Sequence, residues 1–157
     1  MFRIKGGSAL PCPSDKLIQS VESFYRIKFP EDYAVFLKEY NGAKPITNTF
    51  ILGNREYLVE RFLCLLGDEI NDYEEGWADI GVIIQPIYER LTDDADSYGL
   101  PIIPVGFIFA GDLLCLDFRK DKVNPQVCVW LHEESEEFAP ATEKVADSFT
   151  DFLGMLR

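Results

Sequence analysis

Apolar residues recur every three or four positions in two stretches near the start of the chain, which is the spacing of one helix face. The first stretch follows Ser14, a residue that can cap a helix. Its apolar positions are Leu17, Ile18, Val21, Phe24 and Tyr25. The second stretch is FPEDYAVFLKEYNGAKP, with Tyr33, Phe36, Leu37 and Tyr40 on one face. Pro30 suits the first turn of this helix and Asn41-Gly42 suits a left-handed end, so the pattern predicts two short helices.

Apolar runs bounded by turn residues follow in the middle of the chain. NTFILGN and EYLVERFLCLLG read as two strands joined by a turn at Gly53-Asn54. The acidic segment 68–79 is predicted to form a surface loop or a short helical turn. Helical spacing then returns at Ile80, Ile83, Ile84, Ile87 and Leu91. Because Pro86 falls inside this series, we expect a helix that is kinked or that begins near the proline.

The second half of the chain is the richest in strand patterns. IIPVGFIFA, DLLCLDF and QVCVWLH are predicted to form consecutive antiparallel strands, with a turn at Gly111-Asp112 between the first two. The polar loop EESEEFAPAT then leads to a last helix. Its apolar face holds Val145, Phe149, Phe152, Leu153 and Leu156. Strands grouped between helices predict an α+β fold, with helices packed at both chain ends on a largely antiparallel sheet meander.

Composition indicates one folded domain, residues 1–157. With 157 residues, of which 47% are hydrophobic and 13% aromatic, the chain is long and apolar enough to bury a core. It has no apolar run of the length that crosses a bilayer, and its N-terminus lacks the continuous apolar segment of a secretory signal. The four cysteines are widely spaced, without a C-x-x-C pair, which is typical of reduced thiols. These features predict a cytoplasmic protein.

The net charge of −12 is unevenly distributed. Residues 1–67 hold nine Lys or Arg against seven Asp or Glu, a balance of +2, whereas residues 68–157 hold six against twenty, a balance of −14. The acids gather in GDEINDYEEGWAD, TDDAD and HEESEE. Such a surface repels nucleic-acid phosphates and anionic membranes and attracts a basic partner. The alternative interpretation is that the acidic loops serve only solubility.

Four motifs occur in order along most of the chain: the proline-led helix that ends in Asn-Gly, LPIIPVGFIFAGDLLCLDFR, VCVWLHEE and VADSFTDFLGML. Together they resemble the SUKH superfamily, which includes bacterial toxin-immunity proteins and fungal regulators of cell-wall synthesis. The resemblance extends from about residue 14 to residue 153. Its main positions are Pro30, Asn41, Gly42, Gly111, Asp112, Asp117, Trp130, His132 and Glu133.

The chain departs from the family pattern in two places. Where the family often has a run of glycines before the aspartate of the turn, this chain has FIFAGD. Residues 47–92 match the family only in general pattern, so the resemblance does not say which partner would bind there.

The family positions also have purely structural interpretations. Asn41-Gly42 suits a helix end, and Gly111-Asp112 suits a turn whose aspartate binds nearby backbone N–H groups. Trp130 alternates with Cys128 along a strand, which places it in the core or on the floor of a groove. His132 is then a structural or hydrogen-bonded histidine near the end of that strand.

Candidate catalytic and metal-binding groups are few. Along one strand, His132 and Cys128 lie about 13 Å apart, which is too far for a hydrogen bond. Cys115 could meet His132 only across strands, without a third group to orient the pair. The carboxylates of DDAD lack the glycine and distal glutamate of a calcium loop, and one histidine with scattered cysteines makes no zinc site. KGGSALP lacks the Lys-Ser/Thr of a phosphate loop. We therefore predict no enzyme activity, metal or cofactor.

Three functional hypotheses follow. The resemblance implies a cytoplasmic immunity protein that neutralises a toxin, and a nuclease or deaminase with a basic nucleic-acid site would suit an acidic partner. The predicted partner-binding residues are acidic, with a tryptophan that either anchors the partner or lies in the core: Asp93, Asp94, Asp96, Glu133, Glu134, Glu136, Glu137, Glu74, Glu75 and Trp77. An intracellular scaffold or regulator, as in the fungal branch, is the second hypothesis. An enzyme with an unrecognised site is the third. The oligomeric state stays open.

Overall fold

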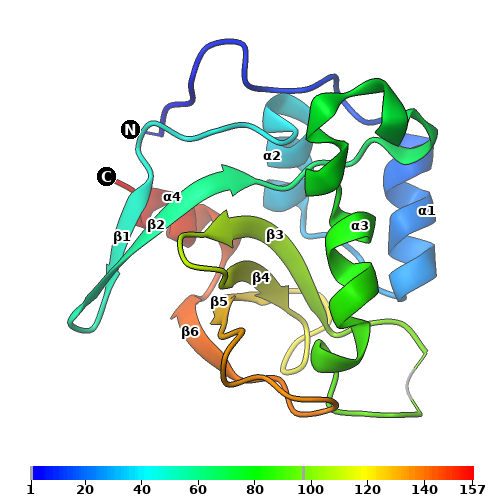
Figure 1. Cartoon of the computed structure of the whole chain (residues 1–157), viewed down its shortest axis with the longest axis vertical. Coiled ribbons are helices and arrows are strands. Elements are labelled where there is room, and N and C mark those ends of the chain that lie inside the picture. Colours follow the sequence, from blue (N-terminus) through cyan, green and yellow to red (C-terminus); the bar gives the residue numbers. More distant parts are fainter. Residues whose placement is uncertain (1, 97) are drawn as a thin grey trace.

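Six strands form one antiparallel sheet in the computed structural model, which describes residues 2–96 and 98–157 (Figure 1). The sheet order is β1-β2-β3-β4-β5-β6, so each strand pairs with its neighbours in sequence. The strands are β1 (Thr49–Leu52), β2 (Arg55–Phe62), β3 (Ile102–Ile108), β4 (Leu113–Asp117), β5 (Gln126–Trp130) and β6 (Thr142–Ala146). This arrangement confirms the predicted α+β fold and its antiparallel meander.

The helical elements lie before, between and after these strands. The α-helices are α1 (Asp15–Tyr25), α2 (Glu31–Tyr40), α3 (Ile80–Ile84) and α4 (Phe149–Met155). Three 3-10 segments connect β2 to β3 together with α3: η1 (Gly67–Asp72), η2 (Glu74–Ala78) and η3 (Gln85–Arg90). Helices near both chain ends were predicted, and both predictions are confirmed.

Helices cover both faces of the sheet, with α3 in front of β3 and α4 behind the sheet in Figure 1. Behind the sheet, the rings of Phe36 in α2 and Phe149 in α4 pack edge-on against Phe62 in β2, with ring centroids 4.7 and 6.3 Å away. In front of it, α3 buries Ile80 and Ile84. Buried apolar surface of this kind supplies most of the free energy that favours folding.

Local sequence signals account for several element ends. The Ser14 Oγ accepts a hydrogen bond from the Leu17 N–H at 3.0 Å, which confirms the predicted cap of α1. The β1–β2 turn contains Gly53 at a φ of 61°, a conformation that glycine adopts without strain. The α-helical geometry of α3 stops at Ile84 and continues as η3, in agreement with the expected effect of Pro86.

Some predicted positions are wrong. Val145 was assigned to the last helix but lies in β6, and α4 begins only at Phe149, after its cap Ser148. The sequence of this edge strand, TEKVA, is polar where it faces solvent and so resembles a loop. Phe24 was placed on the buried face of α1 but is 72% exposed. Pro30 precedes α2 as its N-cap, one residue before the predicted position.

All four cysteines are free thiols, and they differ in burial. Cys12 is exposed, whereas Cys64, Cys115 and Cys128 are buried. Burial raises the pKa of the Cys64 thiol to about 12 and also raises that of Cys115. The reactive species is the thiolate, so both groups should be inert in the folded protein.

We expect one thiol per chain to react rapidly with a disulfide reagent such as Ellman's reagent in mildly alkaline buffer, and all four to react in concentrated guanidinium chloride. The release of thionitrobenzoate followed by absorbance gives both counts. The Cys12→Ser variant should lose the rapid phase and keep the three slow thiols. Rapid reaction of a second thiol in the native wild-type protein would contradict the burial of the other three.

Candidate partner-binding surface

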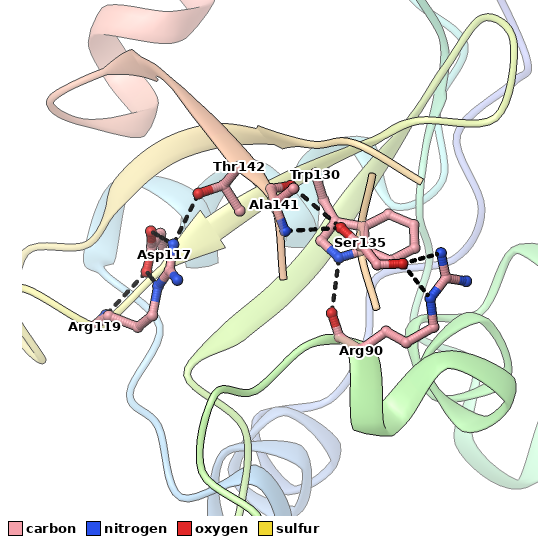
Figure 2. Close-up of polar contacts among 7 residues, drawn as sticks. All are labelled: Arg90, Asp117, Arg119, Trp130, Ser135, Ala141 and Thr142. Carbon is pink, nitrogen blue, oxygen red and sulfur yellow. Dashed lines mark hydrogen bonds and ion pairs between the residues drawn. The ribbon is translucent and has the colours of Figure 1, made fainter. Parts of the chain in front are cut away.

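Arg90, the last residue of η3, fixes the loop that follows β5 (Figure 2). Its Nε and Nη2 donate to the backbone oxygen of Ser135 at 3.1 and 2.9 Å, and Nη2 also donates to the backbone oxygen of His132. The guanidinium lies over the ring of Trp130, 4.9 Å from its centroid, and the Trp130 Nε1 donates to the Arg90 carbonyl at 2.9 Å. Because guanidinium donors are arranged in a rigid fork, one side chain can satisfy several carbonyls at once.

The loop is also closed on itself. The buried Ser135 hydroxyl accepts a hydrogen bond from the Ala141 N–H at 2.9 Å and donates to the Ala141 carbonyl at 3.3 Å (Figure 2). The Phe138 N–H donates to the Glu89 carbonyl of η3 at 2.7 Å. These bonds hold the backbone inward and leave the acidic side chains in solvent. The exposed glutamates of the loop are Glu133, Glu134, Glu136 and Glu137.

A second acidic loop leaves the same end of η3. It contains two local side-chain turns, in which the Asp94 N–H donates to the Thr92 Oγ1 at 3.2 Å and the Asp96 N–H donates to the Asp94 Oδ1 at 2.9 Å. Asp93, Asp94 and Asp96 are exposed. Both loops therefore adjoin Arg90, one covalently through Leu91 and the other through hydrogen bonds. We call their seven exposed carboxylates the acidic surface: Asp93, Asp94, Asp96, Glu133, Glu134, Glu136 and Glu137.

Asp117 lies near this surface and forms an ion pair with Arg119. Its two carboxylate oxygens accept hydrogen bonds from the Nε and Nη2 of Arg119 at 3.0 and 2.9 Å, and Nη2 also donates to the Thr142 Oγ1 at 2.8 Å (Figure 2). The hydrogen bond with Asp117 raises the pKa of Arg119, and the charge of Asp93 adds to this effect. The pair ties the end of β4 to β6, so Asp117 has a structural role.

Trp77 lies at the other end of the α3–η3 segment, in η2. Its side chain is 55% exposed and its ring packs at a tilt of 32° against Phe107, with centroids 5.1 Å apart. Beneath it, the guanidinium of the buried Arg61 lies 5.9 Å from the Trp77 ring and donates from Nη2 to the Gly42 carbonyl at 2.6 Å. Glu74 is exposed and Glu75 half-buried. This group precedes α3 in the chain, whereas the acidic surface follows η3 and β5, and no hydrogen bond or ion pair among the described residues joins the two groups.

The family positions mostly hold segments together. The Asp112 Oδ1 accepts a hydrogen bond from the His132 N–H at 3.0 Å, which is a contact across the sheet rather than the predicted bond within the turn. Gly111 has a φ of 101°, and a side chain on it would meet the His132 ring at 3.0 Å. Cys115 pairs with Cys128 and not with His132, so these residues form no catalytic dyad. Trp130 is buried, in agreement with the prediction of a core position.

Asn41 and Gly42 connect three parts of the chain. The Asn41 side chain is fully buried, and its Nδ2 donates to the carbonyls of Pro11 and Leu65 at 2.9 and 3.0 Å. Its Oδ1 accepts from the Leu65 N–H at 2.8 Å. Asn41, at the end of α2, therefore binds both the N-terminal segment and the chain after β2.

Reasoning from sequence missed Arg90 and Ser135. Neither residue lies in a recognisable motif. The carbonyls that the Arg90 side chain binds are more than forty positions away, and the partner of the Ser135 hydroxyl is six positions away. The only signal in the sequence was the density of acids in HEESEE. It indicates an acidic loop but does not identify the residues that hold the loop backbone.

Two searches within the described residues gave negative results. No group of three or more His, Cys, Asp or Glu side chains could hold a metal ion in this part of the chain. Among the same residues, no helix combines the length and the apolar character that a membrane span requires.

Comparison with protein families gives the decisive match. The model of the SUKH_6 family, described as SMI1-KNR4 cell-wall, matches residues 15–153. The chain belongs to the SUKH superfamily. Searches of curated proteins and of solved structures gave no match. Membership in the family supports a protein-binding module of the immunity-protein or SMI1-KNR4 type, and it leaves the partner to be found.

Proposed function

We propose that this SUKH protein is a cytoplasmic immunity protein that binds a toxin and blocks it by protein–protein contact, without catalysis, cofactor or metal. The toxin would carry a basic, nucleic-acid-targeting domain, such as a nuclease or a deaminase. The observation that carries the proposal is the acidic surface, in which seven exposed carboxylates from two loops adjoin one arginine. Residues 1–157 would act as a single domain.

Electrostatics explains why such a surface suits this partner. A net charge of −12, with the acids concentrated in the second half, attracts a basic cleft and repels nucleic acid and anionic membranes. The loop backbone is already bonded to Arg90 and Ser135, so less conformational freedom is lost on binding than for an unstructured acidic tail. Occupation of the basic cleft would exclude the nucleic-acid substrate. The exposed ring of Trp77 would be a second contact, with Glu74 and Glu75 beside it.

The direct test is neutralisation. The chain is used as bait in the source organism's lysate and secreted fraction, at low and at high salt, and a recovered toxin domain is then expressed with and without the chain. The proposal requires the toxin domain alone to arrest growth and co-expression of the chain to restore it. Binding that leaves the toxin fully active would overturn neutralisation.

Changing Glu133, Glu134, Glu136 and Glu137 together to glutamine should slow association with the toxin about tenfold at low salt, because long-range attraction acts on the encounter rate. The salt dependence of the association rate should become flatter. Stopped-flow mixing at several ionic strengths measures both changes, while the dissociation rate should change much less.

The matched control removes the same charge elsewhere. Glu31, Glu39, Glu56 and Glu60 are exposed on α2 and β2, and their replacement by glutamine leaves the acidic surface intact. If both quadruple variants slow association equally, net charge alone is responsible and the acidic surface has no special role. An unchanged rate in the first variant would remove the electrostatic argument.

The second candidate is an intracellular scaffold or regulator of cell-wall synthesis, which the SMI1-KNR4 description of the matching family favours. The same pull-down separates the two. Recovery of several signalling or cell-wall proteins whose binding is insensitive to salt, and none of which arrests growth, would support the scaffold.

A further inference from the structure

A cavity of about 520 Å³ opens at the C-terminal end of α1, beside the end of β4. Its floor is apolar and includes the buried side chains of Leu100 and Phe118. Its walls include two tyrosines, Tyr25 and Tyr98. The volume falls within the range of small-ligand sites, roughly 300–1,000 Å³. We call it the tyrosine cavity.

The charge around the tyrosine cavity is opposite to that of the whole chain. Arg26, Lys28 and Lys122 line it, and none of the described residues that line it is acidic. Lys28 has a distant ion-pair partner in Glu22, at 3.7 Å, and that carboxylate also accepts a hydrogen bond from the Phe29 N–H. Within the described part of the chain, Arg26 and Lys122 form no salt bridge. In a protein of net charge −12, such a concentration of cations points to an anionic ligand.

Tyr98 offers an aromatic ring beside these cations. The Arg26 guanidinium lies 5.2 Å from the centroid of the Tyr98 ring, and the Tyr98 side chain is 79% exposed. Tyr25 is buried, with 7% of its surface exposed, so it contributes to the wall and offers no open ring face. Aromatic and guanidinium groups next to one another bind planar rings by stacking, while lysines bind phosphate or carboxylate oxygens.

The backbone beside the cavity includes one uncommon conformation. Arg26 ends α1 in the left-handed conformation, with φ 57° and ψ 45°, where glycine is preferred. A non-glycine residue is sterically strained there. Gly99 packs against the backbone of Tyr25, where a side chain on it would meet the Tyr25 carbonyl at 2.2 Å. The Leu100 N–H donates to that carbonyl at 3.0 Å. Strained residues of this kind cluster at binding sites.

We propose that the tyrosine cavity binds a small aromatic anion of the mononucleotide class, with its ring against Tyr98 and its phosphate at Arg26 and Lys122. The site shares no residue with the acidic surface and does not depend on the proposed immunity function. Because the lining combines an exposed tyrosine ring with cationic side chains, the ligand needs both parts, an aromatic ring and an anionic group.

Titration calorimetry with AMP, adenosine and inorganic phosphate as separate probes tests the proposal on the full chain. AMP should bind with a submillimolar Kd, and the other two should each bind about tenfold more weakly or not at all. No heat from AMP at millimolar concentration would overturn the proposal. Phosphate that binds as tightly as AMP would overturn it as well, because Tyr98 would then have no role.

Two variants locate the site. Lys122→Gln should weaken AMP binding about tenfold, whereas Lys120→Gln, an exposed lysine two positions away that does not line the cavity, should leave it unchanged. Arg26→Gly removes the guanidinium from a position that glycine tolerates well, so it should weaken binding by a similar factor and keep the chain folded. Equal effects of the two lysine changes, or an unchanged affinity in Arg26→Gly, would contradict the assignment.

Discussion

Replacement of Asn41 by alanine is expected to lower the free energy of unfolding by about 3–5 kcal/mol. The amide makes three hydrogen bonds inside the core, two to carbonyls and one to an N–H. Each such bond contributes about 1 kcal/mol, and backbone groups that stay buried without a partner cost about 1–3 kcal/mol more. Domains of this size are stable by about 5–15 kcal/mol, so the loss is a large fraction of the total. Urea denaturation followed by circular dichroism measures it.

Two further variants separate hydrogen bonding from shape. Asn41→Asp keeps the size of the side chain and the oxygen that accepts from the Leu65 N–H. It replaces the amide nitrogen, which donates to the Pro11 and Leu65 carbonyls, with a second oxygen. It should be at least as destabilising as alanine. Asn71→Ala, at an exposed position in η1, should change stability by less than about 0.5 kcal/mol. An aspartate variant as stable as the wild-type protein would mean that the three bonds contribute little.

Features coded by neighbouring residues could be predicted from the sequence. The cap at Ser14, the turn at Gly53 and the break near Pro86 each depend on the conformational preferences of one or two residues, and all three are present. The strand meander was equally visible, because short apolar runs separated by turn residues pair with their neighbours in sequence.

Features that depend on distant partners could not be predicted. β6 is recognisable only through its pairing with β5, since its own sequence is polar. Asn41 was read as a helix end, and that much is correct, but its partners Pro11 and Leu65 lie 30 and 24 positions away. The same limit applies to Arg90, which organises the acidic surface from a segment that matches the family only in general pattern. The tyrosine cavity likewise combines the end of α1 with residues beyond 97.

Replacement of Gly42 by alanine should be the second strongly destabilising change, by about 2–5 kcal/mol. Gly42 has a φ of 69°, where any other residue costs about 1–2 kcal/mol. A Cβ there would also stand 2.9 Å from the Cys64 Cβ and 3.2 Å from the Leu10 Cδ1, and relief of such a contact in a packed core costs about 1–3 kcal/mol. Urea denaturation midpoints, at equal slope, measure the sum of the two effects.

Gly53 provides the control that separates these two contributions. It has nearly the same backbone conformation, with a φ of 61°, but no atom lies within 4 Å of the place where a Cβ would be. Gly53→Ala should therefore show only the conformational cost of about 1–2 kcal/mol. The additional loss of stability in Gly42→Ala then measures the clash with Cys64 and Leu10. Equal losses in the two variants would mean that the Leu10 and Cys64 side chains move aside freely. In that case the requirement for glycine at this family position would come from the backbone alone.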